Sequence, residues 1–131
     1  MSKEHTLTLI EQDPQRYIRF DLYHNGVGLR IFIASFSSPV PPSTLLQATI
    51  HYDKAVSVPV GSPLFLRLGR SGASWNTFYS GDGANWTEII PAPAIPALST
   101  LTRIGVYAGN HYPQAGSPPP AFTALVDYFA V

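Results

Sequence analysis

The chain's 131 residues suffice for one domain, 1–131, with a sizeable core, because 45% of them are hydrophobic. Eight basic and eight acidic residues cancel, so no strong field would attract nucleic acid or an anionic membrane surface, and neither is expected as a partner. Cysteine is absent, which excludes disulfides and thiolate metal sites. Abundant β-branched and aromatic residues, with 13 prolines and 10 glycines, favour short strands and turns over helices.

The N-terminal third predicts strands. Residues 1–10 contain no long apolar run, so they predict neither a signal peptide nor a membrane span, although residues 6–10 are apolar enough for a strand that ends at the polar turn 11–15. Residues 16–23 alternate, with three apolar side chains on one side of the strand and polar ones on the other. The turn His24-Asn25-Gly26 leads into a second alternating run, 27–36, with Val27 on its apolar face, so the pair is predicted to form a hairpin.

The middle of the chain is predicted to hold the strands to which all others are added. After a proline-rich loop at 37–43, a strand at 45–51 and a short valine strand within 52–62, the runs 64–70 and 74–80 are joined by Ser71-Gly72. A Gly-Asp-Gly turn then brings Trp86 to a third strand, 86–90.

The last third alternates proline-rich loops with strands. A loop at 91–96 precedes a strand at 102–109, and a loop at 110–120 precedes a final strand at 121–131. Eight or nine strands without a helix of normal length predict an all-β, antiparallel β-sandwich.

Six segments together are similar to one family: EQDPQRYIRFDLY, GLRIFIASF, PLFLRLGRSG, FYSGDGANWTEI, IGVYAGN and PPAFTALVDYFAV. They resemble the concanavalin A-like lectin/glucanase superfamily, in its bacterial laminin-G-like branch, over about residues 9–131. The resemblance implies a jelly-roll sandwich from a secreted bacterial protein, often one that acts on carbohydrates.

The resemblance begins in mid-domain, which implies an incomplete sandwich without its upstream strands. Missing strands leave sheet edges and an apolar face uncovered, so a two-fold homodimer is expected. The alternative is that residues 1–10 supply a replacement strand and that the sandwich is merely small.

The resemblance also implies that glycans bind on the concave face and on the loops at one end, through aromatic rings and polar side chains. The residues expected in such a site are Trp75, Tyr107, Asn110, His111 and Tyr112. For each of them, packing or ordinary surface exposure is the alternative.

A polar set is predicted to line one face of adjacent strands: Arg19, Asp21, Arg30 and Arg67. Arg19 and Arg67 are the candidates for binding an acidic or hydroxylated ligand through their guanidinium groups. The alternative is charge pairing between strands on a solvated or dimer-buried sheet.

The turn at residues 80–86 predicts a carboxylate that bonds its own backbone, with Trp86 packed beneath it. Asp82 and Asn85 are the weaker candidates for a calcium site, since calcium takes oxygen ligands. No other cofactor is expected, because the four histidines have no metal-ligand spacing.

Catalysis is not predicted. Glucanases of the superfamily need paired carboxylates, and Glu11 and Asp13 are followed by Arg16 where the third acid would fall. The sequence therefore predicts a non-catalytic, lectin-like module for carbohydrate. The alternative is a structural domain that dimerises through its open sheet and binds no small ligand.

Overall fold

The computed structural model describes the backbone of residues 3–38, 47–58 and 63–111, and the side chains of the same residues except 3–8 and 107–111. This part of the chain is all-β, as predicted, and contains no helix. Its strands are β1 (Lys3–Asp13), β2 (Arg16–His24), β3 (Leu29–Ser37), β4 (Gln47–Ala55), β5 (Phe65–Ser71), β6 (Ser74–Ser80), β7 (Thr87–Ile89) and β8 (Arg103–His111).

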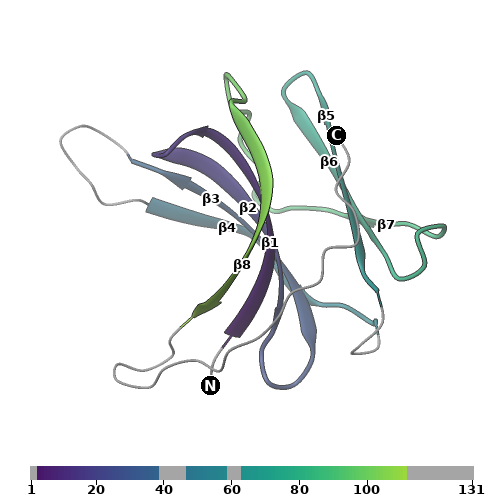
Figure 1. Ribbon diagram of the computed structural model, residues 1–131. Helices are drawn as coiled ribbons and strands as arrows, with labels where there is room; N and C mark the ends of the chain where they lie inside the picture. Colours follow the sequence, from purple (N-terminus) through teal and green to yellow (C-terminus); the bar gives the residue numbers. More distant parts are fainter. Residues whose placement is uncertain (1–2, 39–46, 59–62, 112–131) are drawn as a thin grey trace.

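The strands form two antiparallel sheets, consistent with the predicted β-sandwich. The larger sheet has the order β4-β3-β2-β1-β8 and curves through the centre of Figure 1, and the smaller sheet, β5-β6-β7, lies on the right. The prediction that all other strands add to the 64–86 unit is therefore wrong, because β1, β2, β3, β4 and β8 form a separate sheet and, among the described strands, β7 alone is added to β5 and β6.

The N-terminal strand occupies the inside of the larger sheet. β1 pairs with β2 on one side and with β8 on the other. It extends beyond the predicted 6–10, with a register shift between Glu11 and Asp13, so that only Pro14 and Gln15 remain for the turn. Residues 3–10 thus belong to a strand of the larger sheet, in the segment where the alternative prediction placed a strand.

The β2–β3 hairpin confirms the predicted alternation, and it starts its second strand later than expected. Val27 lies in the turn and is 89% exposed instead of facing the core. Asn25 Oδ1 accepts hydrogen bonds from the backbone N–H groups of Val27 and Gly28 at 2.9 and 3.0 Å, and Gly26 has a φ of 91°. The side-chain bonds of Asn25 hold these residues in the turn.

The core lies between the sheets. Four side chains of β2 and β3 are at most 1% exposed: Ile18, Phe20, Ile31 and Ile33. Buried side chains of β1, β7 and the segments after β4 and β7 complete the cluster: Ile10, Val56, Ile89, Ile95 and Leu98. Three leucines in and just before β5 pack against it: Leu64, Leu66 and Leu68. Two adjacent strands of the larger sheet therefore dominate the core.

Several predicted boundaries change. β4 runs to Ala55, so the valine strand predicted after it is absent at Val56 and Val58, while Val60 lies outside the described residues. Asn110 and His111 belong to β8 and not to a loop. The predicted strand at 121–131 lies outside the described residues, and the described part of the chain has no helix able to cross a membrane.

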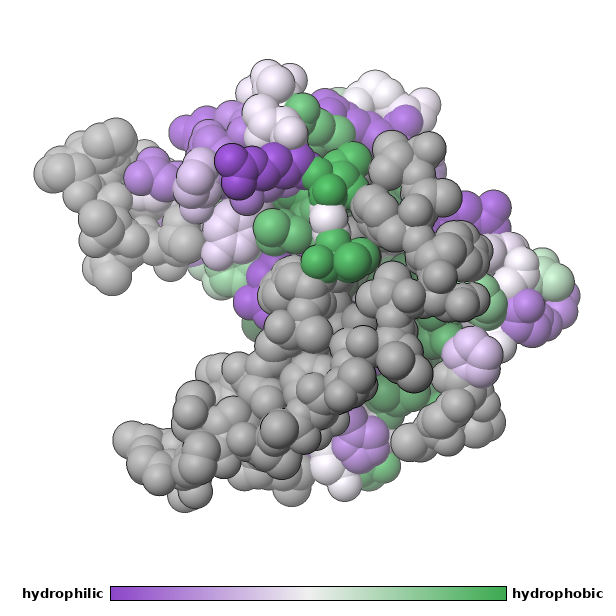
Figure 2. All heavy atoms as spheres, viewed as in Figure 1, coloured by the Kyte–Doolittle hydropathy of each residue, from purple (hydrophilic) through white to green (hydrophobic). Residues whose placement is uncertain are grey.

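The described part of the larger sheet ends at β8, where apolar side chains are exposed. Ile104 and Val106 are 42% and 41% exposed, although Ile104 pairs with the buried Ile10 and shares its side of the sheet. Figure 2 shows hydrophobic side chains at the surface over the middle of β8. The core-facing side of the sheet is thus incompletely covered at this strand.

Candidate binding site

A cleft of about 350 Å³ opens on the outer face of the larger sheet. Its lining residues come from β1, β2 and the turn between them: Leu9, Glu11, Pro14, Tyr17 and Arg19. Glu11 pairs with Tyr17 and Leu9 pairs with Arg19, whereas Ile10 and Ile18 between them face the core. The two-residue period of a strand therefore places these four lining side chains on one face.

Tyr17 and Arg19 both pack on Phe36 of β3. The Tyr17 and Phe36 rings stack with centroids 4.9 Å apart and an interplanar angle of 15°. The Arg19 guanidinium lies 5.4 Å from the centroid of the Phe36 ring and pairs with Asp21 at 2.6 Å. The pair with the fully buried Asp21 fixes the Arg19 guanidinium in position. Because the Arg19 side chain is 26% exposed, this group can still be reached from the cleft.

On the side toward β8, a glycine pairs with one of the lining residues of the cleft. Gly105 pairs with Leu9, and a Cβ atom added at Gly105 would meet no other atom within 4 Å. Arg103 pairs with Glu11, and Tyr107 pairs with Leu7. The open space at Gly105 extends the cleft face across β1.

The strand period also sorts the predicted residues of β8. Along β8, Tyr107 and His111 have the same parity as Gly105, which pairs with Leu9, whereas Asn110 has the opposite parity. Tyr112 lies outside the described residues.

The other two predicted residues lie elsewhere. Trp75 packs against the core from β6, with its ring centroid 6.4 Å from that of Phe20, and its Nε1 donates to the Pro96 carbonyl at 3.0 Å. Arg67 belongs to β5 of the smaller sheet and packs on Trp86. The prediction that Arg67 shares a face with Arg19 is therefore wrong, since the two residues are in different sheets.

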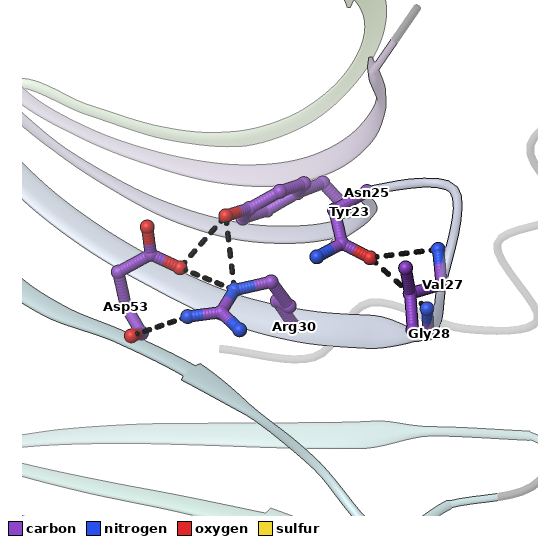
Figure 3. Close-up of polar contacts among 6 residues, drawn as sticks. All are labelled: Tyr23, Asn25, Val27, Gly28, Arg30 and Asp53. Atoms are coloured by element: carbon purple, nitrogen blue, oxygen red, sulfur yellow. Dashed lines mark hydrogen bonds and ion pairs between the residues drawn. The ribbon is translucent and has the colours of Figure 1, made fainter. Parts of the chain in front are cut away.

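A second polar cluster on the cleft face ties three strands together (Figure 3). Tyr23 Oη donates to Asp53 Oδ1 at 2.7 Å, and Arg30 Nε donates to the same oxygen at 2.8 Å. Burial raises the pKa of the Tyr23 phenol, Asp53 raises it further, and Arg30 opposes both. Arg30 and Asp53 thus form the cross-strand charge pair that was the predicted alternative to ligand binding.

The Asp82 carboxylate bonds the backbone of its own turn, as predicted. Asp82 Oδ1 accepts hydrogen bonds from Ser80 Oγ and from the N–H groups of Ala84 and Asn85, at 2.7–2.9 Å. The bonds from Asn85, followed by those from Ala84 and Ser80, hold the pKa of the Asp82 carboxyl well below its usual range. Asn85 Nδ2 also donates to Asp82 Oδ2 at 2.7 Å, so the two candidate calcium ligands bond each other. The described residues contain no cluster of three or more His, Asp or Glu able to hold a metal.

The sequence prediction missed Tyr17, Glu11 and Leu9 as neighbours of Arg19. The signal for Tyr17 was present, because it alternates with Arg19 on the polar side of β2. The contribution of β1 was harder to predict, since its pairing register with β2 depends on the turn and on the shift at Glu11. Comparison with protein-family models, curated proteins and solved structures finds no match.

Proposed function

We propose that the chain is a non-catalytic binding module that takes up carbohydrate in the cleft beside Arg19, and that it is a jelly-roll relative of the concanavalin A-like superfamily. The observation that carries the proposal is the combination of groups in one cleft. A phenol ring, a guanidinium and a carboxylate lie together beside the apolar Leu9 and Pro14. Among these lining residues Glu11 is the single acid, whereas a glycosidase needs two carboxyl groups across the scissile bond.

These groups match the two surfaces of a sugar. Hydroxyl groups donate to a carboxylate and accept from a guanidinium, while the C–H face of a pyranose packs on an aromatic ring. The cleft, at about 350 Å³, is at the small end of ligand pockets, which span roughly 300–1,000 Å³. It would therefore hold the end of a glycan.

The substitutions Tyr17→Ala and Glu11→Gln are each expected to weaken binding of the preferred glycan about tenfold or more, measured by calorimetry after a glycan-panel screen. Tenfold corresponds to about 1.4 kcal/mol, within the range for one charged hydrogen bond. Lys54→Gln is the control, because Lys54 is an exposed charged residue on β4 and does not line the cleft. Failure of the wild-type chain to bind any panel glycan, or unchanged binding by both variants, would contradict the proposal.

The second candidate function is self-assembly without a small ligand, and the exposed Ile104 and Val106 favour it. A second copy packed on β8 would cover these side chains, as expected of a two-fold dimer. Light scattering across a dilution series should then show a dimer for the wild type and a monomer for Ile104→Lys. A wild type that stays monomeric at all concentrations would exclude this function.

A further inference from the structure

The outer face of the smaller sheet carries an ordered row of side chains. Arg67 pairs with Phe78, and Phe78 pairs with Glu88, so the three residues cross β5, β6 and β7 side by side. Leu66, Leu68 and Tyr79 of the same strands pack against the core, which leaves the row on the opposite face. Trp86, at the end of the Asp82 turn, joins the row at Arg67.

Arg67 packs over two aromatic rings. Its Cζ lies 3.9 Å from the centroid of the Trp86 ring and 5.4 Å from that of Phe78. At these distances the guanidinium gains a cation–π interaction with each ring. A guanidinium that packs on the face of a ring restricts its own motion and keeps N–H groups for a planar, bidentate acceptor.

The turn before Trp86 keeps this arrangement in place. Gly83 has a φ of 77°, and a Cβ atom added there would lie 3.4 Å from the Phe65 ring, so the turn lies directly over Phe65. The Phe65 and Trp86 rings meet edge to face with centroids 6.5 Å apart. The Asp82 hydrogen bonds therefore fix the turn, the turn fixes Trp86, and Trp86 fixes Arg67.

Arg67 differs from Arg19, Arg30 and Arg70 in its partners. Arg19 and Arg30 pair with aspartates, and Arg70 donates to the carbonyls of Gly72 and Leu98. The contacts of Arg67 within the described residues are with aromatic rings, and its side chain is exposed. A fixed, exposed guanidinium without a carboxylate partner in this part of the chain is suited to receive an external carboxylate.

We propose that this face binds a uronic acid residue of an acidic glycan, at a site separate from the cleft beside Arg19. The C6 carboxylate pairs with the Arg67 fork, the sugar ring packs on Phe78 and the edge of Trp86, and Glu88 accepts a hydrogen bond from a ring hydroxyl. A nucleic acid is a poorer match, since backbone binding needs several cations in line and this row holds one, Arg67. The inference rests on these contacts and not on the proposed function.

The test is a calorimetric titration of the full chain with trigalacturonate, with the indole N–H signal of Trp86 followed by NMR. Arg67→Gln should weaken binding at least tenfold, and Arg67→Lys should restore only part of it, because lysine keeps the charge without the fork. Lys54→Gln is the matched control, since Lys54 is another exposed cation over an aromatic ring, 5.3 Å from the centroid of Tyr52. The methyl ester of the same trisaccharide should bind as weakly as the Arg67→Gln variant binds the acid.

Four results would overturn the inference. They are no binding of trigalacturonate by the wild type, equal binding of its methyl ester, unchanged binding by Arg67→Gln, and tighter binding of an RNA oligonucleotide at the same residues. Glu11→Gln distinguishes this site from the cleft. Loss of trigalacturonate binding in that variant would place the acid beside Arg19, whereas its retention would support the separate site even if the cleft binds nothing.

Discussion

Replacement of Trp75 by alanine is expected to lower the free energy of unfolding by about 3 kcal/mol, the low end for removal of a large aromatic side chain from a core. The ring packs against the core cluster beside Phe20 and is only partly buried, which favours the low end. It also bridges β6 and the segment after β7, because its Nε1 donates to the Pro96 carbonyl at 3.0 Å. Urea denaturation followed by circular dichroism measures the change.

Trp75→Phe separates the ring from its hydrogen bond. Phenylalanine keeps most of the packing and loses the N–H donor, so the expected cost is about 1 kcal/mol. Neither variant should change glycan affinity while it is folded. If Trp75→Ala retained wild-type stability and lost glycan binding, the residue would be a ligand-binding side chain, as the sequence predicted.

The local elements of this fold could be predicted from the sequence, because residues close together in the chain determine them. The alternation of Ile18 and Phe20 with Arg19 and Asp21 marked β2 as half-buried, and all of its predicted apolar positions face the core or pack against it. The β5–β6 hairpin was fixed by its turn, where Gly72 adopts a φ of 60° that other residues rarely take. Turn chemistry and strand period act over a few residues, so they appear in the sequence directly.

Which strands belong to which sheet could not be predicted from the sequence, because it depends on contacts between distant segments. β1 pairs with β8, so that Ile10 lies opposite Ile104, and no local signal in either strand identifies the other as its partner.

The same limit affected the prediction of the binding site. In β6 both faces carry aromatic residues, Trp75 and Tyr79 on one and Phe78 on the other, so alternation separated the faces without showing which one is buried. Trp75 was therefore predicted to bind a ligand, whereas it packs against the core and Phe78 lies on the outer face.

The structural role of His51 could not be predicted from the sequence either, since it depends on a register shift in β4. Ile33 pairs with Tyr52 and Ala34 pairs with Ile50, which leaves His51 as the extra residue of a β-bulge. Its side chain is buried, with Nδ1 2.8 Å from the Pro93 carbonyl and Nε2 2.7 Å from Ser35 Oγ. Because a carbonyl only accepts, Nδ1 carries the proton and Nε2 accepts from the Ser35 hydroxyl. One imidazole thus joins β3, β4 and the segment that follows β7.

His51→Ala is expected to lower the free energy of unfolding by about 3 kcal/mol, because it leaves a cavity, a carbonyl and a hydroxyl without their partner. Ser35→Ala removes one hydrogen bond and should cost about 1 kcal/mol. Since the two side chains bond each other, the double variant should cost about 1 kcal/mol less than the sum of the single variants.

Hydrogen exchange gives a second readout of the same link. The Ala92 N–H donates to the His51 carbonyl at 2.8 Å, so its exchange should accelerate far more in His51→Ala than in Ser35→Ala. Equal stabilities of the two single variants, with an unchanged Ala92 exchange rate, would show that His51 does not anchor the segment after β7. The expected result would instead mean that a bulged histidine in the edge region of one sheet holds the chain segment that supplies Ile95 and Leu98 to the core.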